Sequence, residues 1–395
     1  MFGNLLSNSV FIIDGMRTPV GSPYKSLKNF SAAQLSSFVI KELLRRNKVN
    51  KYLINQVILG NAVAAGMGQN FARQASLLAD LDESIPAFSV NAVCGSGLQA
   101  AIVGAQAILA QEAQLIVAGA AESATSNPFL LSRDDQEDER WKNYKDSLLA
   151  DGLYCSISKK SMGDLVEDMV KKYNISREEQ DQYALDSHKK ACLAQQQNKF
   201  INEIVSVRIS NQKIVEKDDH PRQNMKIESL RELPSSFKEA GTVTAGNASS
   251  PCDGAAAVLL ASKKFLNEHK IKPKARIVGY VSIGVKPELT FESAMGAING
   301  CLHKCHLTLK DIDLFEIAES FAAQLVLIKN KLGIADQKLN IWGGDIGIGH
   351  PLGVSGIRVL VTLLHALTDR KLRRGLACVS YGGGGAIAVI VERQD

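Results

Sequence analysis

The sequence lacks the features that mark membrane, nucleic-acid-binding and disordered proteins. No apolar run reaches the roughly 20 residues that a membrane-spanning helix needs. Hydrophobic residues make up 45 % and charged residues 22 %, and the formal net charge of +5 is not gathered into a basic stripe. Residues 1–20 have neither a basic segment nor a long apolar one, so they predict no secretory signal. We expect a globular, cytoplasmic protein that binds a small anionic ligand, with no membrane or nucleic-acid partner.

Cysteine is sparse, and its number is odd. The 395 residues include seven cysteines, at positions 94, 155, 192, 252, 301, 305 and 378. This spread predicts reduced thiols, one of which could be a nucleophile. Cys301 and Cys305 share one face of a predicted helix, His303 points elsewhere, and no second cysteine pair completes a zinc site. We therefore predict no bound metal.

Short β-branched stretches alternate with segments of helical period along much of the chain. Strands that alternate with helices of this kind predict a layered α/β architecture. The expected strands are 10–13, 57–59, 87–93, 113–118, 277–281, 314–317, 376–379 and 387–391. The expected helices are 33–46, 71–81, 98–111, 177–196, 321–332 and 357–367.

Composition divides the chain into three parts. Residues 120–245 are richer in charged and amide side chains and indicate a polar insertion, whose long helix begins with a capping-box pattern at Ser176. Residues 1–119 with 246–270 form a first α/β half, and residues 271–395 form a second half with a similar order of elements. We expect two similar halves and one inserted loop domain.

Cys94 lies in the most informative segment of the chain. A predicted strand runs into a glycine-rich turn at Cys94-Gly95-Ser96-Gly97, and a helix of small residues follows. This is the layout of a nucleophile elbow, in which the helix N-terminus lowers the pKa of the thiol and the reactive atom stays accessible. The alternative is a buried structural cysteine before a tight turn.

His350 lies in a second unusual segment, 343–356, which is rich in glycine. Glycine allows the backbone to approach other groups closely, and Pro351 fixes the chain beyond the histidine. A histidine held in this way can deprotonate a thiol or donate a hydrogen bond to a developing oxyanion. A purely structural histidine is the alternative.

Five segments together resemble the thiolases, which are acyl-CoA C-acyltransferases, and the resemblance runs from about residue 9 to residue 393. The matching segments are 17–21 (RTPVG), 68–75 (GQN followed by ARQA), 94–97 (CGSG), 241–249 (GTVTAGNAS) and 349–351 (GHP).

The resemblance implies a fold, a reaction and a mode of assembly. The two halves would pack as a five-layered α/β/α/β/α structure, with the insertion helping to bind coenzyme A. Cys94 would attack an acyl thioester to form an acyl-enzyme, and His350 would activate the thiol. The family also implies a homodimer or homotetramer that meets through an edge strand, a role in fatty acid metabolism, and an acyl-CoA thioester as substrate with no permanently bound cofactor.

The chain departs from the family at three motifs. The second catalytic cysteine of the family's Cys-x-Gly-Gly-Gly motif is replaced by Ser380, and a hydroxyl is a far weaker base precursor than a thiol. Cys378 could take this role only after a register shift. The family's Asn-Glu-Ala-Phe reads Ala-Glu-Ser-Phe at 318–321, and its His-Met-Gly reads Ser-Met-Gly at 161–163. The run from Ser380 also resembles ketosynthases, which condense without a second cysteine, so this position need not hold a thiol. Glu319 and Asp345 are candidates for the base that would replace it.

The resemblance also assigns residues to coenzyme A. Arg222 matches a position that contacts the adenine end, where a guanidinium suits stacking and phosphate. Ser249 matches a residue near the pantetheine arm, and Met162 and Phe321 match positions that line the pocket. A solvated surface charge is the alternative for Arg222, and a core position is the alternative for Met162 and Phe321.

Three hypotheses remain open from the sequence. The leading one is an acyl-CoA C-acyltransferase, similar to acetyl-CoA acetyltransferases, that forms an acyl-Cys94 intermediate and has an altered proton-transfer group at Ser380. The second is an acyltransferase or thioesterase without Claisen chemistry. The third is a non-catalytic acyl-CoA-binding subunit.

Overall fold

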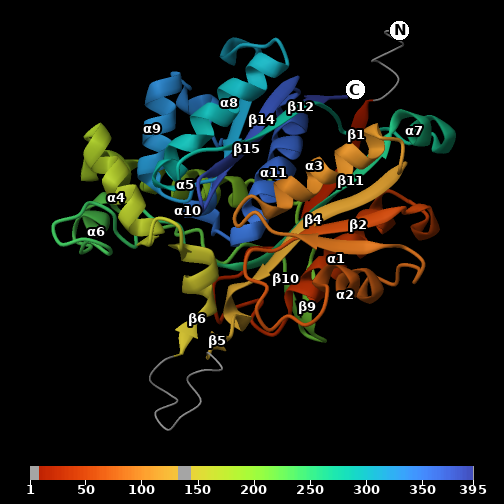
Figure 1. Cartoon of the computed structure of the whole chain (residues 1–395), viewed down its shortest axis with the longest axis horizontal. Helices are drawn as coiled ribbons and strands as arrows, with labels where there is room; N and C mark the ends of the chain where they lie inside the picture. The colour runs from red at the N-terminus through yellow and green to blue at the C-terminus, as the bar shows by residue number, and fades with distance from the viewer. Residues whose placement is uncertain (1–8, 132–143, 395) are drawn as a thin grey trace.

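A nine-stranded mixed sheet forms the centre of the protein, as Figure 1 shows. The computed structural model describes residues 9–131 and 144–394. Along the sheet the strands run in the order β13-β14-β15-β12-β1-β11-β4-β2-β3. Their bounds are β1 (Val10–Arg17), β2 (Gln56–Gly60), β3 (Ala87–Val90), β4 (Leu115–Ser123), β11 (Asp253–Ser262), β12 (Ala275–Gly284), β13 (Leu314–Ile317), β14 (Arg374–Tyr381) and β15 (Gly385–Arg393).

The sheet consists of two halves that are joined by a short seam. The strands β1, β11, β4, β2 and β3 form one half, and β13, β14, β15 and β12 form the other. Only two residue pairs, Phe11 with Arg276 and Ile12 with Ala275, connect β1 to β12. The two halves can therefore turn relative to each other and enclose helices between them.

Five layers result from the way the helices cover these two halves. The central layer holds α3 (Ser96–Leu109) and α11 (Ser355–Arg370), whose apolar residues share one buried cluster with both halves of the sheet. A second cluster places α1 (Ala32–Arg46), α2 (Phe71–Leu78) and α7 (Lys263–His269) on the outer face of the first half. A third places α8 (Ser293–Lys304) and α9 (Ala322–Leu332) on the outer face of the second half. The predicted order α/β/α/β/α is confirmed.

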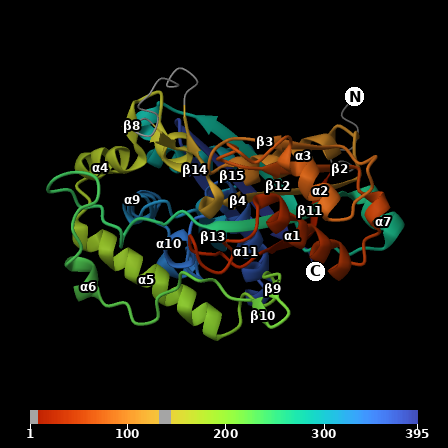
Figure 2. The same cartoon turned by 90° about the horizontal axis from the view of Figure 1, so that it is seen from below.

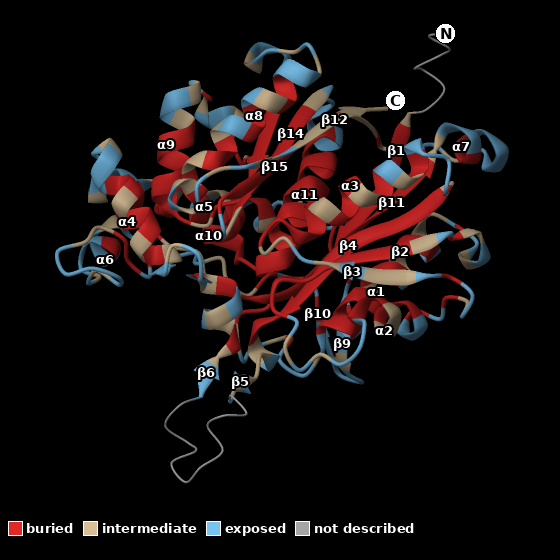
Figure 3. Cartoon of the chain, in the orientation of Figure 1, coloured by how far each residue is buried: buried red, intermediate tan, exposed pale blue. Residues whose placement is uncertain are grey.

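Of the two central helices, α11 is enclosed almost completely, as the burial colours in Figure 3 show. The segment Leu352–Arg370, which contains α11, is long and apolar enough to cross a membrane, yet 89 % of its most apolar window is buried inside the protein. Its apolar character is thus accounted for by packing between two sheets, where a helix is hydrophobic on nearly all sides.

The insertion forms helices and small hairpins beside the layered core (Figure 2). Its helices are α4 (Met162–Tyr173), α5 (Arg177–Gln196) and α6 (Ile227–Arg231). Its hairpins pair β5 (Phe129–Leu130) with β6 (Lys145–Asp146), β7 (Tyr154–Cys155) with β8 (Lys160–Ser161), and β9 (Val207–Ser210) with β10 (Lys213–Val215). As the sequence predicts, α5 begins with a capping box in which Ser176 and Glu179 satisfy each other's backbone N–H groups.

Several elements were not predicted from the sequence, and for two of them, β11 and α4, the physical reason is clear. The strand β11 is buried along almost all of its ten residues and therefore lacks the alternation of apolar and polar residues that marks a half-exposed strand. The helix α4 begins at a capping box between Ser161 and Asp164, which the comparison with the His-Met-Gly motif overlooked. The strands β4 and β11 flank the insertion and pair with each other, whereas the three-part domain division stays a prediction.

Candidate active site

A cavity of about 220 Å³ lies where the two halves and the insertion meet, and six of the seven predicted site residues line it. These six are Cys94, Met162, Ser249, Phe321, His350 and Ser380. They come from the turn after β3, the start of α4, the loop before β11, the start of α9, the loop after α10 (Asp345–Ile348) and the end of β14. The seventh residue, Arg222, is not part of the lining.

Cys94 lies in a strained turn between β3 and α3. The preceding residue, Val93, has a φ of 48°, a conformation that β-branched residues rarely adopt. Ser96 donates a hydrogen bond of 2.6 Å from its hydroxyl to the carbonyl of Val93, which holds the turn closed. Gly95 is required because a Cβ there would lie 2.7 Å from a ring carbon of Tyr381. The predicted strand, turn and helix are thus present, and the thiol lies beside the helix N-terminus with the residue 8 % exposed.

His350 is held on both sides by backbone contacts of the glycine-rich loop. Its N–H donates to the carbonyl of Ser250 at 3.0 Å, and its carbonyl accepts from the N–H of Cys252 at 3.1 Å. Gly349 has a φ of 109°, and a Cβ there would lie 2.7 Å from the sulfur of Cys252. The glycine before the histidine is therefore a steric requirement of this close approach.

The imidazole of His350 lies among groups that stabilise its charged form. The hydroxyl oxygen of Ser355 is 2.7 Å from Nδ1, and an oxygen of Asp345 is 3.7 Å from the same nitrogen. Burial alone would lower the pKa of His350, but interactions with the carboxylate of Asp345 and with Cys94 outweigh it and raise the pKa to about 10. His350 and Cys94 therefore form an interacting pair.

Asp345 is a buried anion behind His350 and does not line the cavity. Its oxygens lie 3.2 Å from Nε and 3.1 Å from Nη2 of Arg358, and one of them accepts a hydrogen bond of 2.8 Å from the N–H of Glu319. Burial opposes ionisation, but the charges of Arg358 and His350 hold the pKa of Asp345 below its usual range. A carboxylate held in this way is separated from the substrate space.

Glu319, the other candidate for a base, is also outside the cavity lining. Its carboxylate accepts hydrogen bonds from Tyr183, Ser187 and Asn340 at 2.7 to 2.8 Å. The N–H of Ile346 donates to it at 3.1 Å. Through these contacts Glu319 links α5, the segment after β13 and the loop that carries His350. Because neither Glu319 nor Asp345 lines the cavity, the geometry favours neither of them as the base.

Ser380 faces the cavity at the end of β14. Its hydroxyl accepts a hydrogen bond of 3.0 Å from Nε2 of Gln324 and lies 3.1 Å from the hydroxyl of Ser293. The pairing of β14 with β15 is regular through Cys378 and Ser380, so no register shift brings Cys378 to the cavity. Cys378 is buried below α8, where burial raises the pKa of its thiol.

The wall of the cavity is largely aromatic and aliphatic. Phe321 makes edge-to-face contacts with Phe291, at a centroid distance of 5.1 Å, and with Phe237, at 6.1 Å. Met162 packs against the same apolar cluster, so Met162 and Phe321 border both the core and the cavity. Sequence reasoning missed Phe237 and Phe291, because neither lies in a motif whose spacing points to a pocket.

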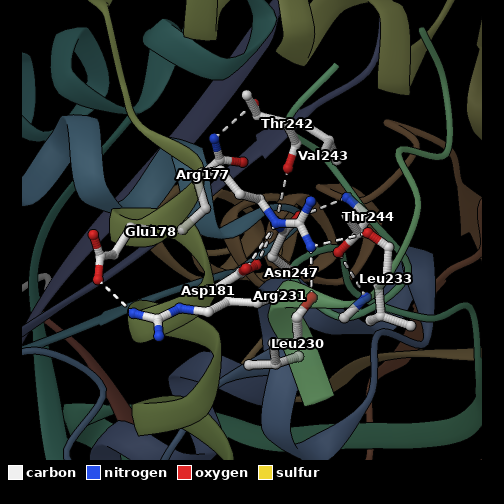
Figure 4. Close-up of polar contacts among 12 residues, drawn as sticks. Arg177, Glu178, Asp181, Leu230, Arg231, Leu233, Thr242, Val243, Thr244 and Asn247 are labelled. Carbon is white, nitrogen blue, oxygen red and sulfur yellow. Dashed lines mark hydrogen bonds and ion pairs between the residues drawn. The ribbon is translucent and has the colours of Figure 1, made fainter. Parts of the chain in front are cut away.

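A polar network, drawn in Figure 4, ties α5 of the insertion to the loop before β11, two residues from Ser249 in sequence. Asn247 donates from its side chain to Asp181 of α5 at 2.8 Å and to the carbonyl of Thr242 at 3.1 Å. Arg177 forms an ion pair of 2.7 Å with the other oxygen of Asp181. The hydroxyl of Ser249 then donates to the carbonyl of Ser320 at 2.9 Å, which joins two walls of the cavity.

Arg222 lies on the surface of the insertion, beside two histidines. Its backbone N–H lies 3.4 Å from Nδ1 of His188, whose ring stacks on that of His220 with centroids 5.6 Å apart. Burial, together with the positive charge of Arg222, lowers the pKa of His188 to about 3 and that of His220 to about 4. The guanidinium is exposed, so its contact with coenzyme A stays a prediction. Within residues 9–131 and 144–394, no cluster of three or more His, Cys, Asp or Glu side chains suits a metal ion.

Comparisons with known proteins cover almost the whole chain. Residues 10–264 match the family model of the thiolase N-terminal domain, and residues 271–393 match that of the thiolase C-terminal domain. The acetyl-CoA acetyltransferase of Escherichia coli (strain K12) is 42 % identical over 389 residues, which cover 97 % of this chain and 99 % of the relative. The acetyl-CoA acetyltransferase of Allochromatium vinosum is 39 % identical over 395 residues, which cover 98 % of this chain and all of the relative.

Solved structures agree with these relatives. Human mitochondrial 3-ketoacyl-CoA thiolase in complex with CoA has a TM-score of 0.95 at 35 % identity, and the match covers 99 % of each chain. The Bacillus anthracis acetyl-CoA acetyltransferase has a TM-score of 0.94 at 34 % identity, covering 98 % of this chain and 99 % of the other. The chain therefore belongs to the thiolase family and is a thiolase-type acyltransferase.

Proposed function

We propose that the protein is an acyl-CoA C-acyltransferase, similar to acetyl-CoA acetyltransferases, that works through an acyl-Cys94 intermediate. The observation that carries the proposal is the meeting of Cys94 and His350 in the lining of one cavity, where the two side chains interact electrostatically. The strained elbow presents the thiol beside the N-terminus of α3.

Acyl transfer to Cys94 needs only groups that meet at this cavity. The sulfur of Cys94 attacks the thioester carbonyl, a new carbon–sulfur bond forms, and the carbon–sulfur bond to coenzyme A breaks. The proton that Cys94 gave to His350 then passes to the departing sulfur of coenzyme A, which leaves as a neutral thiol. The reverse sequence returns the acyl group to a thiol acceptor.

The proton transfer at the α-carbon is the altered step in this proposal. In the described part of the chain, Cys94, His350 and Tyr381 are the titratable side chains that line the cavity. The motif resemblance matches Ser380 to the family's second thiol, and the Ser380 hydroxyl is hydrogen-bonded to Gln324 and Ser293. We therefore propose that acyl-Cys94 forms readily, whereas making or breaking the carbon–carbon bond depends on His350 and is slow.

The absence of a second thiol from this lining also favours the alternative of acyl transfer without Claisen chemistry. In that case acyl-Cys94 would pass its acyl group to water or another acceptor, and Ser380 would have no part in proton transfer. Cleavage of acetoacetyl-CoA separates the two, since only the C-acyltransferase consumes it.

An exchange assay tests the proposed acyl-enzyme directly. Isotope-labelled coenzyme A is incubated with unlabelled acetyl-CoA and enzyme, and the label is followed into acetyl-CoA. We expect exchange in the wild type without any second acyl substrate, and loss of exchange in Cys94→Ala. No exchange in a correctly folded wild type would refute the proposal and favour a non-catalytic acyl-CoA-binding subunit.

We further propose that acyl-CoA binds along the insertion and that the protein is a homodimer or homotetramer. The exposed Arg222 and the cavity-lining Met162, Ser249 and Phe321 support the first proposal. The strand β3 supports the second, because it lies at one end of the sheet and its unpaired side could pair with another copy. Light scattering would test the oligomer. The cytoplasmic location and the role in fatty acid metabolism stay predictions.

A further inference from the structure

A fixed negative charge lies directly behind the imidazole of His350. Asp345 opens α10 and is fully buried, and its two oxygens are occupied by Arg358 of α11 and by the N–H of Glu319. A buried carboxylate with this many partners keeps both its ionised form and its position. The anion is therefore a permanent part of the site.

The imidazole lies between this anion and the nucleophile. Nδ1 of His350 is 3.7 Å from Asp345, too far for a direct hydrogen bond, and 2.7 Å from the hydroxyl of Ser355. The ring also interacts with the thiol of Cys94, and both side chains line the cavity. The hydroxyl oxygen of Ser355 can thus accept a hydrogen bond from Nδ1–H, while Asp345 acts through its charge, which is strong at short range in a buried site.

We infer that Asp345, clamped by Arg358, is a positioning residue that keeps His350 as an imidazolium and thereby keeps Cys94 as a thiolate in the resting enzyme. The inference rests on the proposed function, since it takes Cys94 as the nucleophile. Cys94, His350 and Asp345 are arranged like a catalytic triad, in which a buried carboxylate orients the histidine and stabilises its charged form. Cys94 then attacks without first losing a proton, and His350 already holds the proton that the departing sulfur of coenzyme A needs.

The other titratable and charged groups around this pair do not replace Asp345. Arg358 is positive and acts against the imidazolium, but it is paired with Asp345. Burial raises the pKa of Glu316 on β13 to about 8, so at neutral pH it is mostly uncharged. Burial likewise raises the pKa of Cys252, which flanks the His350 loop, and leaves its thiol neutral. The carboxylate of Glu319 is turned toward α5, where Tyr183 and Ser187 bind it.

The pH profile of Cys94 alkylation tests this role without any acyl-CoA. The rate of modification by iodoacetamide is measured from pH 5 to 9 on the Cys94 peptide by mass spectrometry, in the wild type, Asp345→Asn and the control Glu319→Gln. We expect the midpoint of Asp345→Asn to rise by at least one pH unit, which slows alkylation at the acidic end about tenfold, because a tenfold change follows from each unit of pKa. We expect Glu319→Gln to keep the wild-type midpoint. An unshifted Asp345→Asn profile would overturn the inference.

A measurement on the wild type covers the case in which Asp345→Asn does not fold. The ¹⁵N shifts of the histidine rings, with the His350 signals assigned through a His350→Asn variant, report whether both ring nitrogens carry protons. We expect a doubly protonated His350 at pH 7, and a singly protonated ring would overturn the inference. Both experiments are independent of acyl transfer, so a protein with the predicted profile but no isotope exchange would contradict the proposed function alone.

Discussion

Replacing Ser380 with cysteine should restore the step that the native residue supports poorly. The new sulfur would occupy the position of the serine oxygen, 3.0 Å from Nε2 of Gln324 and 3.1 Å from the hydroxyl of Ser293. An ordinary thiol has a pKa near 8.5, so roughly 10 % of it is ionised at pH 7.5. Each hydrogen bond to an anion is worth about 1.5 to 3 kcal/mol and would increase that fraction.

The size of the gain follows from what a positioned base contributes. General base catalysis typically supplies about 10²- to 10⁴-fold in rate. We therefore expect Ser380→Cys to raise the thiolytic cleavage of acetoacetyl-CoA by on the order of 10²-fold. Formation of acyl-Cys94 should be unchanged, because neither Cys94 nor His350 contacts the altered atom among the hydrogen bonds described.

The assay follows loss of acetoacetyl-CoA absorbance in the presence of free coenzyme A, with Ser380→Ala as the matched control. We expect the alanine variant to form acyl-Cys94 and to cleave no faster than the wild type. The reasoning would be refuted by a Ser380→Cys protein that acylates normally but shows no gain in cleavage. A wild type that already cleaves at the rate of Ser380→Cys would refute it as well.

Three further substitutions test two parts of the site and one buried carboxyl outside the cavity lining. Gly95→Ala should slow isotope exchange at least tenfold, because its Cβ would lie 2.7 Å from the ring of Tyr381. Adding Tyr381→Ala should restore part of the rate. A Gly95→Ala protein with wild-type exchange would contradict the steric argument. Arg222→Ala should raise the KM for coenzyme A several-fold at unchanged kcat. The control Arg231→Ala, which removes an exposed arginine paired with Glu178, should leave the KM unchanged. Equal KM values in the two variants would exclude a specific contact between Arg222 and coenzyme A. Burial raises the pKa of Glu122 from 4.5 to about 7, so the folded state holds a proton that the unfolded state releases. The free energy of unfolding should therefore fall by up to about 3 kcal/mol as the pH rises from about 5 to about 7. Melting curves should show that Glu122→Gln loses less stability over this pH range than the wild type does. An equal loss would show that Glu122 does not cause the pH dependence.

The two central residues could be found from the sequence because each lies in a local pattern with a steric cause. Cys94 is followed by a glycine that must leave room for Tyr381, and His350 is preceded by a glycine that must leave room for Cys252. Glycines that a close approach requires remain visible in one sequence. The same holds for α5, whose capping box at Ser176 set its beginning.

Other features could not be predicted because they depend on contacts between distant segments. Glu319 is adjacent to a cavity residue in sequence, yet its carboxylate accepts hydrogen bonds from side chains of α5 and from Asn340. No local pattern therefore reveals which way it points. The role of Asp345 depends in the same way on Arg358, one helix later. The buried strand β11 was missed because uniform burial removes the periodicity that identifies a strand.

The mass of Cys94 after exposure to acetyl-CoA tests the central proposal most directly. The protein is mixed with acetyl-CoA in the absence of a thiol acceptor, quenched in acid and digested, and the peptide that contains Cys94 is examined, with Cys94→Ser as the control. We expect one added acetyl group on Cys94 in the wild type and none on the peptides that contain Cys252 or Cys378, whose buried thiols have raised pKa values. An unmodified Cys94 in a protein that binds acetyl-CoA would contradict the proposal.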